Sequence, residues 1–335
     1  MPQAPSAPTE KKSSLVVGAI DDNMVYPLLV WARSLTRTAR TRPRCVIGFL
    51  EGSLSSHNQR FLESALNFLQ IDWELKKLPF DQRFITQGHI SPTTFAKFLL
   101  ADLIESPHLW IDVDTVATPR WDELFAIVAE APKDVSLVVA ERGSPADQPD
   151  KSAEPQSHRT FNAGVLGWPE GSRKPWSDRL DSMAIVETQE QQLFNHLYAD
   201  SLETVPETYN TLTYRVDSLR DLSELPRIIH FAGAHKPWQL PPRFRTRCLI
   251  HECPWSLWFE AETAMLAEFT PRPLRKQVLQ HRAKSLRSGV YRFRREHRGL
   301  GLLKILRLMG PFGWLVVTLF RPLRSFVPRG THPLH

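Results

Sequence analysis

The chain has 335 residues, 42% of them hydrophobic, and a formal net charge of +6, which together indicate a globular protein with a substantial core. Three cysteines (Cys45, Cys248 and Cys253) are too few for a disulfide framework, and no run of about 18 apolar residues indicates a transmembrane helix. The charge is uneven. Residues 271–335 hold 15 Lys/Arg against Glu296 alone, which leaves 27 basic and 35 acidic residues elsewhere. We therefore expect an acidic body with a basic tail.

The N-terminal residues 1–13 are rich in Pro, Ala and Ser and contain no apolar stretch. We expect a disordered leader there, neither a signal peptide nor an anchor. Near the other end of the body, Cys248, His251 and Cys253 are close enough to suggest a metal clip, but their spacing matches no zinc pattern and a fourth ligand is missing.

From residue 14 to about residue 270, short apolar runs alternate with helical patterns. The expected strands are Leu15–Ile20, Cys45–Leu50, Leu109–Val113, Val135–Ala140, Val165–Trp168 and Ile228–Phe231. The expected helices are Tyr26–Thr38, Ser56–Leu69, Thr93–Ile104, Trp121–Ala129, Gln189–Tyr198 and Pro254–Glu268. This alternation predicts an α/β fold with a single, mostly parallel, Rossmann-like sheet that has helices on both faces.

Ligands of such sheets bind beyond the carboxyl ends of the strands, so the residues that follow each apolar run are candidates for a site. The segments Asp21-Asp22-Asn23 and Asp112-Val113-Asp114 both lie in that position. Residues 142–159 are polar and include three prolines, which predicts a long loop of the kind that often acts as a lid or binds substrate.

The segment from Leu109 to Thr115 is an apolar strand that ends in two carboxylates, Asp112 and Asp114. Side chains two residues apart in an extended chain share a face, so both can reach one hard cation. Two alternatives stay open for this pattern alone: a solvated strand end, and the nucleophile segment of a haloacid-dehalogenase-like phosphatase, completed by Val116. That phosphatase class needs a later acidic pair for magnesium, whereas the only Asp-Asp of this chain lies upstream.

Two further segments place polar groups beside glycine. Phe161-Asn-Ala-Gly-Val-Leu-Gly167 puts Asn162 at the start of a buried strand, where its carboxamide can donate to one sugar hydroxyl and accept from another; a simple strand start is the alternative. In Ile229-His-Phe-Ala-Gly-Ala-His-Lys-Pro-Trp238, His230 can be a third metal ligand, the Gly233 backbone can approach a diphosphate, and Lys236 can pair with its oxygens.

Taken in order, six segments resemble family 8 glycosyltransferases, a group that includes glycogenin and bacterial lipooligosaccharide and lipopolysaccharide galactosyl- and glucosyltransferases. The segments are Ala-Ile-Asp-Asp-Asn (19–23), His-Ile-Ser-Pro-Thr-Thr-Phe-Ala-Lys (89–97), Asp-Val-Asp (112–114), Phe-Asn-Ala-Gly-Val-Leu (161–166), Gln-Glu-Gln-Gln-Leu-Phe-Asn (189–195) and His-x-x-Gly-x-x-Lys-Pro-Trp (230–238). The resemblance covers residues 14 to about 260, and its last segment is the most specific.

The resemblance implies a GT-A fold, a UDP-sugar donor, Mn²⁺ (with Mg²⁺ as the alternative ion) and retention of anomeric configuration. By the same resemblance, Asp112, Asp114 and His230 bind the metal, Ala19, Asp21 and Asn23 hold uridine, and Gly233 and Lys236 hold the diphosphate. Asn162, Glu190 and Gln191 surround the donor sugar, with Glu190, Gln191 and Lys236 as the catalytic candidates. His89 and Thr94 lie near the acceptor or the edge of the sugar, and Lys97 belongs to the same sugar or acceptor side.

Two positions depart from the family pattern. Glu190-Gln191-Gln192 stands where the family usually has Asp-Gln-Asp, and Lys97 stands where it usually has arginine. A longer carboxylate can change sugar preference, and lysine loses the two-pronged grip of a guanidinium. We expect a retaining hexosyltransferase that moves galactose or glucose by front-side attack, with the departing phosphate as base.

The basic tail predicts where such an enzyme works. Residues 274–308 mix Arg and Lys with large apolar residues, and the apolar run Phe312–Phe320 lies between Arg307 and Arg321. This pattern suits a helix lying on an anionic leaflet.

The expected organisation is a leader (1–13), a GT-A domain (14–270) and a membrane-associating tail (271–335). The expected location is the cytoplasmic, inner face of a membrane, with a glycan or lipid-linked acceptor. Alternatives are a solvated charge run, or a degenerate body serving as a membrane- or nucleic-acid-binding module, although no nucleic-acid recognition module is visible.

Overall fold

A computed structural model describes residues 14–84, 86, 90–141, 161–180, 189–240, 245 and 248–296. The predicted leader (1–13), His89, the predicted loop (142–159) and the chain after residue 296 lie outside the described residues. Among the described residues, no helix combines the length and the apolar character needed to cross a bilayer.

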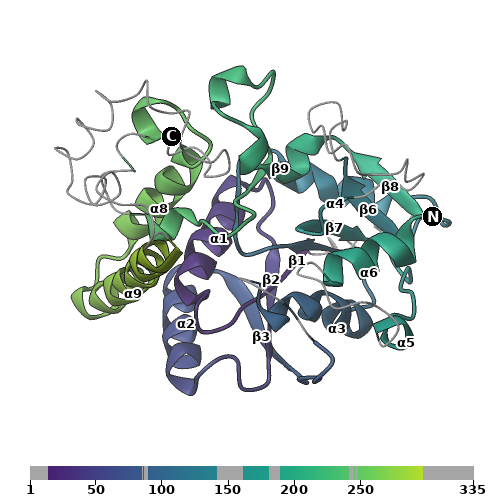
Figure 1. Ribbon diagram of the computed structural model, residues 1–335, viewed down its shortest axis with the longest axis horizontal. Helices are drawn as coiled ribbons and strands as arrows, with labels where there is room; N and C mark the ends of the chain where they lie inside the picture. The colour runs from purple at the N-terminus through teal and green to yellow at the C-terminus, as the bar shows by residue number, and fades with distance from the viewer. Residues whose placement is uncertain are drawn as a thin grey trace, which may run out of the picture.

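The centre of the molecule is a seven-stranded sheet in the order β3-β2-β1-β4-β7-β6-β8 (Figure 1). Its strands are β1 (Leu15–Ala19), β2 (Arg44–Leu50), β3 (Asp72–Leu78), β4 (His108–Ile111), β6 (Leu137–Ala140), β7 (Val165–Trp168) and β8 (Leu202–Val205). All neighbours are parallel except β7, which is antiparallel to both β4 and β6. The predicted α/β, mostly parallel sheet is thus confirmed.

A second, smaller sheet has three strands in the order β5-β10-β9. The prediction of a single sheet did not include it. Its strands are β5 (Thr115–Ala117), β9 (Thr211–Leu212) and β10 (Ile228–His230). Strand β10 runs antiparallel to β5, with His230 opposite Thr115. Because β5 follows β4 after a short turn, this small sheet brings residue 230 next to the end of β4.

Helices cover both faces of the main sheet, since alternate residues of its strands point to opposite sides. Val16 belongs to the core under α1 (Val25–Thr38), α2 (Ser56–Phe68) and α4 (Leu124–Ala129), whereas Val17 belongs to the core under α3 (Ala96–Leu103), α5 (Ser177–Leu180) and α6 (Gln189–Tyr198). Helix α3 continues from a 3₁₀ turn, η1 (Pro92–Phe95), and α4 from η2 (Trp121–Glu123). Each predicted helix is present within a few residues.

Helices α8 (Ser256–Glu268) and α9 (Arg272–Glu296) lie beside α1 and α2 (Figure 1). Val278 of α9 is fully buried in the same core as α1. The buried carboxylate of Glu262 on α8 accepts from Tyr26 Oη (2.6 Å) and Arg282 Nε (2.8 Å), so one group joins α1, α8 and α9. The first turns of the segment assigned to the tail therefore pack as part of the body.

Candidate active site

Three side chains meet where β4 ends and the small sheet begins. Asp112 and Asp114 lie in the turn between β4 and β5, and His230 is the last residue of β10. The backbone amide of Phe231 donates to the carbonyl of Asp114 at 2.9 Å, which holds the two segments together. Strand pairing, rather than closeness in sequence, thus joins residues 112–114 to residue 230.

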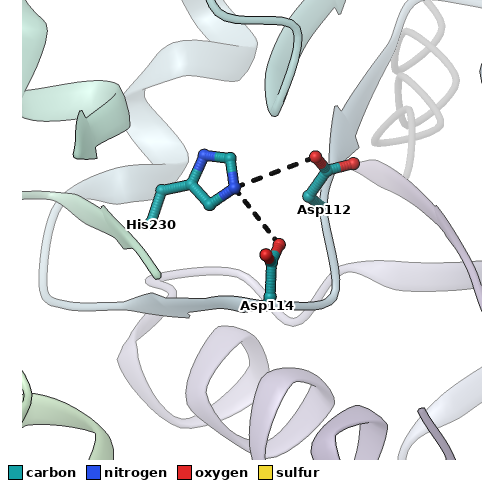
Figure 2. Close-up of side chains that lie close together, drawn as sticks. All are labelled: Asp112, Asp114 and His230. Atoms are coloured by element: carbon teal, nitrogen blue, oxygen red, sulfur yellow. Dashed lines mark ion pairs between the residues drawn. The ribbon is translucent and has the colours of Figure 1, made fainter. Parts of the chain in front are cut away.

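Figure 2 shows the imidazole of His230 directed at both carboxylates. His230 Nε2 lies 3.2 Å from Asp114 Oδ1 and 3.9 Å from Asp112 Oδ2. One ligand atom from each residue lies within 4.8 Å of the other two, and within the described chain no other group of His, Cys, Asp and Glu meets this condition. Two carboxylate oxygens and one imidazole nitrogen suit Mn²⁺ or Mg²⁺, so the donor set fits the expected ion. The alternative clip at Cys248, His251 and Cys253 does not form such a group.

Lys236 provides the positive charge next to this cluster. Its Nζ lies 2.5 Å from Asp114 Oδ2 and donates to the carbonyl of Phe231 at 2.8 Å. Burial by itself would raise the pKa of Asp114, but Lys236 and His230 outweigh it and hold that pKa well below its ordinary value. Asp114 is therefore ionised and ready to bind a cation.

Lys97, expected on the sugar or acceptor side, lies between the metal-ligand cluster and Glu190. Its side chain is 2% exposed, and Nζ lies 3.3 Å from Asp112 Oδ1 and 3.5 Å from Glu190 Oε1. Burial lowers the pKa of Lys97, but Asp112 and Glu190 outweigh that effect, so the net shift is upward and the ammonium stays charged. Lys97 thus joins a predicted metal ligand to a predicted sugar-site residue. The second oxygen of Glu190, Oε2, is buried and has no hydrogen-bond partner among the described residues.

A row of carboxamides links His230 to helix α6. Asn210, at the end of the 3₁₀ turn η4 (Glu207–Asn210), places Oδ1 3.0 Å from His230 Nδ1 and donates from Nδ2 to Asn162 Oδ1 at 3.0 Å. Asn162 Nδ2 in turn donates to Gln191 Oε1 at 3.1 Å. The predicted residues Asn162 and Gln191 therefore meet. Asn210 was not predicted, because nothing in Pro-Glu-Thr-Tyr-Asn distinguishes it from an ordinary turn.

Two glycines of the predicted motifs serve different needs. Gly233 has φ +97° and open space around its α-carbon, so the chain there needs glycine and leaves its backbone accessible. Gly164 is tightly packed. A β-carbon there would lie 2.2 Å from His230 Cε1 and 2.4 Å from Nδ1. Glycine at this position therefore leaves room for the ring of His230.

The segment after β1 forms a second polar group at the same edge of the sheet. Asp21 accepts from the backbone amide of Asn23 at 2.8 Å and from Ser91 Oγ at 2.9 Å, and Thr94 Oγ1 donates to the Ser91 carbonyl at 3.0 Å. Ser91, another residue not predicted, thus joins Asp21 to Thr94. Ala19 ends β1 next to this group. His89 lies outside the described residues.

The model of the family "Glycosyl transferase family 8" matches residues 15–240 of the chain. Glycosyltransferase GlyD of Streptococcus pneumoniae serotype 4 is 27% identical over 215 residues, which are 56% of this chain and 24% of GlyD. The chain therefore spans about a quarter of the length of that curated relative.

Solved structures share the fold. The galactosyltransferase LgtC, in complex with donor and acceptor sugar analogues, superposes with a TM-score of 0.58 at 20% identity, over 75% of this chain and 95% of LgtC. The bifunctional glycosyltransferase WbbM gives 0.54 at 17% identity, over 82% of this chain and 53% of WbbM. GlyE of Streptococcus pneumoniae TIGR4 gives 0.51 at 19% identity, over 78% of this chain and 64% of GlyE.

The family model matches the part of the chain that carries the sheet, the Asp112–Asp114–His230 cluster and Lys236. A phosphatase interpretation of the Asp-Val-Asp segment has no comparable support. The chain belongs to glycosyl transferase family 8 and has the GT-A fold of a glycosyltransferase.

Proposed function

We propose that this protein is a metal-dependent, retaining hexosyltransferase that moves galactose or glucose from a UDP-sugar to a hydroxyl of a glycan or lipid-linked acceptor. The observation that carries the proposal is the cluster of Asp112, Asp114 and His230, with the ammonium of Lys236 next to it. A nucleoside diphosphate leaving group needs its negative charge neutralised, and this cluster provides a cation site and a fixed cation side by side.

Asp112, Asp114 and His230 are the proposed ligands of Mn²⁺ or Mg²⁺. When bound there, the ion would act as a Lewis acid that neutralises charge on the diphosphate. Lys236 would add its charge to the same oxygens, close to the exposed backbone of Gly233. No protein nucleophile is required by this arrangement.

The remaining residues proposed to contact the UDP-sugar and the acceptor are assigned by their position. Asp21, Asn23 and Ala19, at the end of β1, are the proposed uridine contacts. Asn162, Glu190 and Gln191 are proposed to surround the hexose, with Thr94 and His89 near the acceptor side. No residue in the described part of the chain bonds to the buried Oε2 of Glu190, so a sugar hydroxyl that donates to it would satisfy an oxygen that is otherwise costly to bury.

In the proposed reaction, the acceptor hydroxyl attacks the anomeric carbon from the face that the diphosphate leaves. The bond between the anomeric carbon and the phosphate oxygen breaks with its electron pair going to UDP, a new carbon–oxygen bond forms, and the hydroxyl proton passes to the departing phosphate. Positive charge develops on the sugar ring, as in glycoside hydrolysis, and Gln191 or Glu190 would stabilise it. A covalent sugar trapped on Glu190 would contradict this scheme.

A donor panel tests the proposal. UDP release would be measured with Mn²⁺ or Mg²⁺ from UDP-galactose, UDP-glucose and their N-acetyl forms, with Asp114→Ala as the inactive control. The structural neighbour LgtC is a galactosyltransferase, so UDP-galactose is the first donor to try. We expect turnover on one hexose donor. No turnover on any donor, together with no binding of any UDP-sugar, would favour the degenerate, binding-only alternative.

We also propose that the basic C-terminal segment holds the enzyme at an anionic membrane surface on its cytoplasmic side. Support comes from α9, where Arg272, Arg275 and Lys276 are exposed beside Leu279, which is 42% exposed. Residues 271–295 contain no acid that would oppose an anionic leaflet.

The membrane test must leave α9 in place, because Val278 and Arg282 pack on the body. A chain ending at Glu296 and a full-length chain with Arg272, Arg275 and Lys276 changed to Gln would be compared with the wild type on vesicles with and without anionic lipid. We expect both variants to bind anionic vesicles more weakly and to retain UDP release. Undiminished vesicle binding by both would contradict the proposal, and RNA binding would favour the nucleic-acid alternative.

A further inference from the structure

Nε2 of a neutral His230 can bind a metal only if the ring proton is on Nδ1. A neutral imidazole has one N–H and one lone pair, and the hydrogen bond at one nitrogen decides which nitrogen can bind a metal. In this structure Nε2 faces Asp112 and Asp114, while Nδ1 faces the side-chain oxygen of Asn210.

The orientation of the neighbouring amides follows from backbone donors, which have only one possible role. The amide N–H of Gly164 donates to Asn162 Oδ1 at 2.9 Å, so that atom is the oxygen of Asn162 and its NH₂ group faces Gln191. The amide N–H of Ala163 also points at Gln191 Oε1, at 3.4 Å, which identifies that atom as an oxygen.

The orientation of the Asn210 carboxamide follows from that of Asn162. One end of its carboxamide faces two acceptors of Asn162, the side-chain Oδ1 at 3.0 Å and the backbone carbonyl at 3.3 Å. Only the NH₂ end can donate to both. The oxygen of Asn210 therefore faces His230 Nδ1, which must be an N–H to complete the hydrogen bond.

We propose that Asn210 is a positioning residue that keeps the proton on Nδ1 of His230, leaves Nε2 for the metal, and ties this ligand through Asn162 to Gln191 on α6. The inference deepens the proposed function, because it rests on His230 as a metal ligand. Three hydrogen bonds run in one direction through these four side chains: His230 donates to Asn210, Asn210 to Asn162, and Asn162 to Gln191. Asn210 is 4% exposed and His230 is 3% exposed, so water has little access to replace the bond between them.

The first experiment measures Mn²⁺ binding without donor, by the electron paramagnetic resonance signal of the free ion. Asn210→Ala removes the oxygen at Nδ1, and Asn210→Asp keeps an oxygen there while losing the donor to Asn162. Asn195→Ala is the matched control, because Asn195 also makes three hydrogen bonds, to Phe161 and Gln191, but none to His230. Thermal unfolding of each variant would verify that it is folded.

We expect Asn210→Ala to weaken Mn²⁺ binding by about 10- to 100-fold, the usual effect of removing the partner of a ligating histidine. Asn210→Asp should bind within a few-fold of the wild type, and Asn195→Ala should bind like the wild type. Unchanged affinity in Asn210→Ala, or equal losses in Asn210→Ala and Asn210→Asp, would overturn the proposal.

The second experiment needs no variant of Asn210. In the wild-type protein with ¹⁵N-labelled histidine, with and without Mg²⁺, Nδ1 of His230 should give the shift of a protonated nitrogen in both states; His230→Gln identifies the signal. An unprotonated Nδ1 would refute the inference even if the enzyme turns over donors. If Nδ1 is protonated but no metal binds, the proposed function fails while the role of Asn210 in orienting His230 stands.

Discussion

Replacing Gly164 by alanine tests whether the position of His230 is set by packing. The added β-carbon would lie 2.2 Å from Cε1 and 2.4 Å from Nδ1 of His230, where an ordinary contact is at least 3.4 Å. The ring would therefore have to withdraw by about 1.2 Å. It is held on its other sides by Asn210 at 3.0 Å and Asp114 at 3.2 Å, so such a shift breaks the geometry of the metal ligands.

We expect Gly164→Ala to cost about 1–3 kcal/mol of unfolding free energy, the usual range for an overpacked core, and to weaken Mn²⁺ binding by about 10-fold or more. Gly167→Ala is the matched control, three residues further along on strand β7. Its β-carbon would lie 2.2 Å from Val128 Cγ2 and 3.0 Å from Val138 Cβ, a comparable clash that involves no ligand.

Both variants would be assayed by urea unfolding and by Mn²⁺ titration. The expected pattern is a similar loss of stability in both and a loss of Mn²⁺ affinity only in Gly164→Ala. Wild-type Mn²⁺ affinity in a folded Gly164→Ala protein would show that the ring has room to move, and the reasoning would be wrong.

Three more predictions follow from the same structure. Asp114→Ala should abolish both Mn²⁺ binding and sugar transfer, measured by ion titration and UDP release. Asp178→Ala, a change at an exposed residue of α5, should leave both intact. Sugar transfer by the Asp114 variant would contradict the proposed site. Lys97→Met should lower the unfolding free energy by about 3–5 kcal/mol, because it leaves the buried carboxylate of Glu190 and the partly buried one of Asp112 without their cation. Lys97→Arg should recover part of this loss, and a neutral effect of Lys97→Met in urea unfolding would refute the pairing. Burial lowers the pKa of His108 to about 4. On acidification the unfolded chain therefore takes up a proton before the folded one, and the free energy of unfolding falls as the pH drops from about 6.5 towards 4, by about 2 kcal/mol at pH 5. His108→Gln should show a shallower decline in urea unfolding between pH 7.5 and pH 5.

The parts of the site that lie at strand ends could be predicted from the sequence. Asp112 and Asp114 follow an apolar run, and the parallel order of the sheet places that end of the strand where ligands bind. His230 could be predicted as a candidate ligand for the same reason. Its meeting with Asp114 depends on the antiparallel pairing of β5 and β10, two strands of three residues each that carry too little pattern to be recognised.

Other features could not be predicted because they depend on distant contacts. Lys97 is a charged residue on a helix, where an exposed position is usual, and only the packing against Trp110, Asp112 and Glu190 shows that it is buried. Strand β3 has a mixed sequence, Asp-Trp-Glu-Leu-Lys-Lys-Leu, because it is an edge strand and keeps polar residues exposed. The charge of α9 suggested a separate tail, whereas Val278 shows that one face of the helix belongs to the core.

The attachment of α9 sets the mechanical character of the C-terminal region. The helix has 25 residues, which corresponds to about 37 Å at 1.5 Å per residue, and Glu262 fixes it to α1 through Arg282 and Tyr26. The helix is thus fixed to the body and is not a flexible linker. If α9 itself meets an anionic surface through Arg272, Arg275 and Lys276, as proposed, its attachment to the body would fix the height and tilt of the proposed site, and acceptors would be selected partly by how far their hydroxyl stands above that surface.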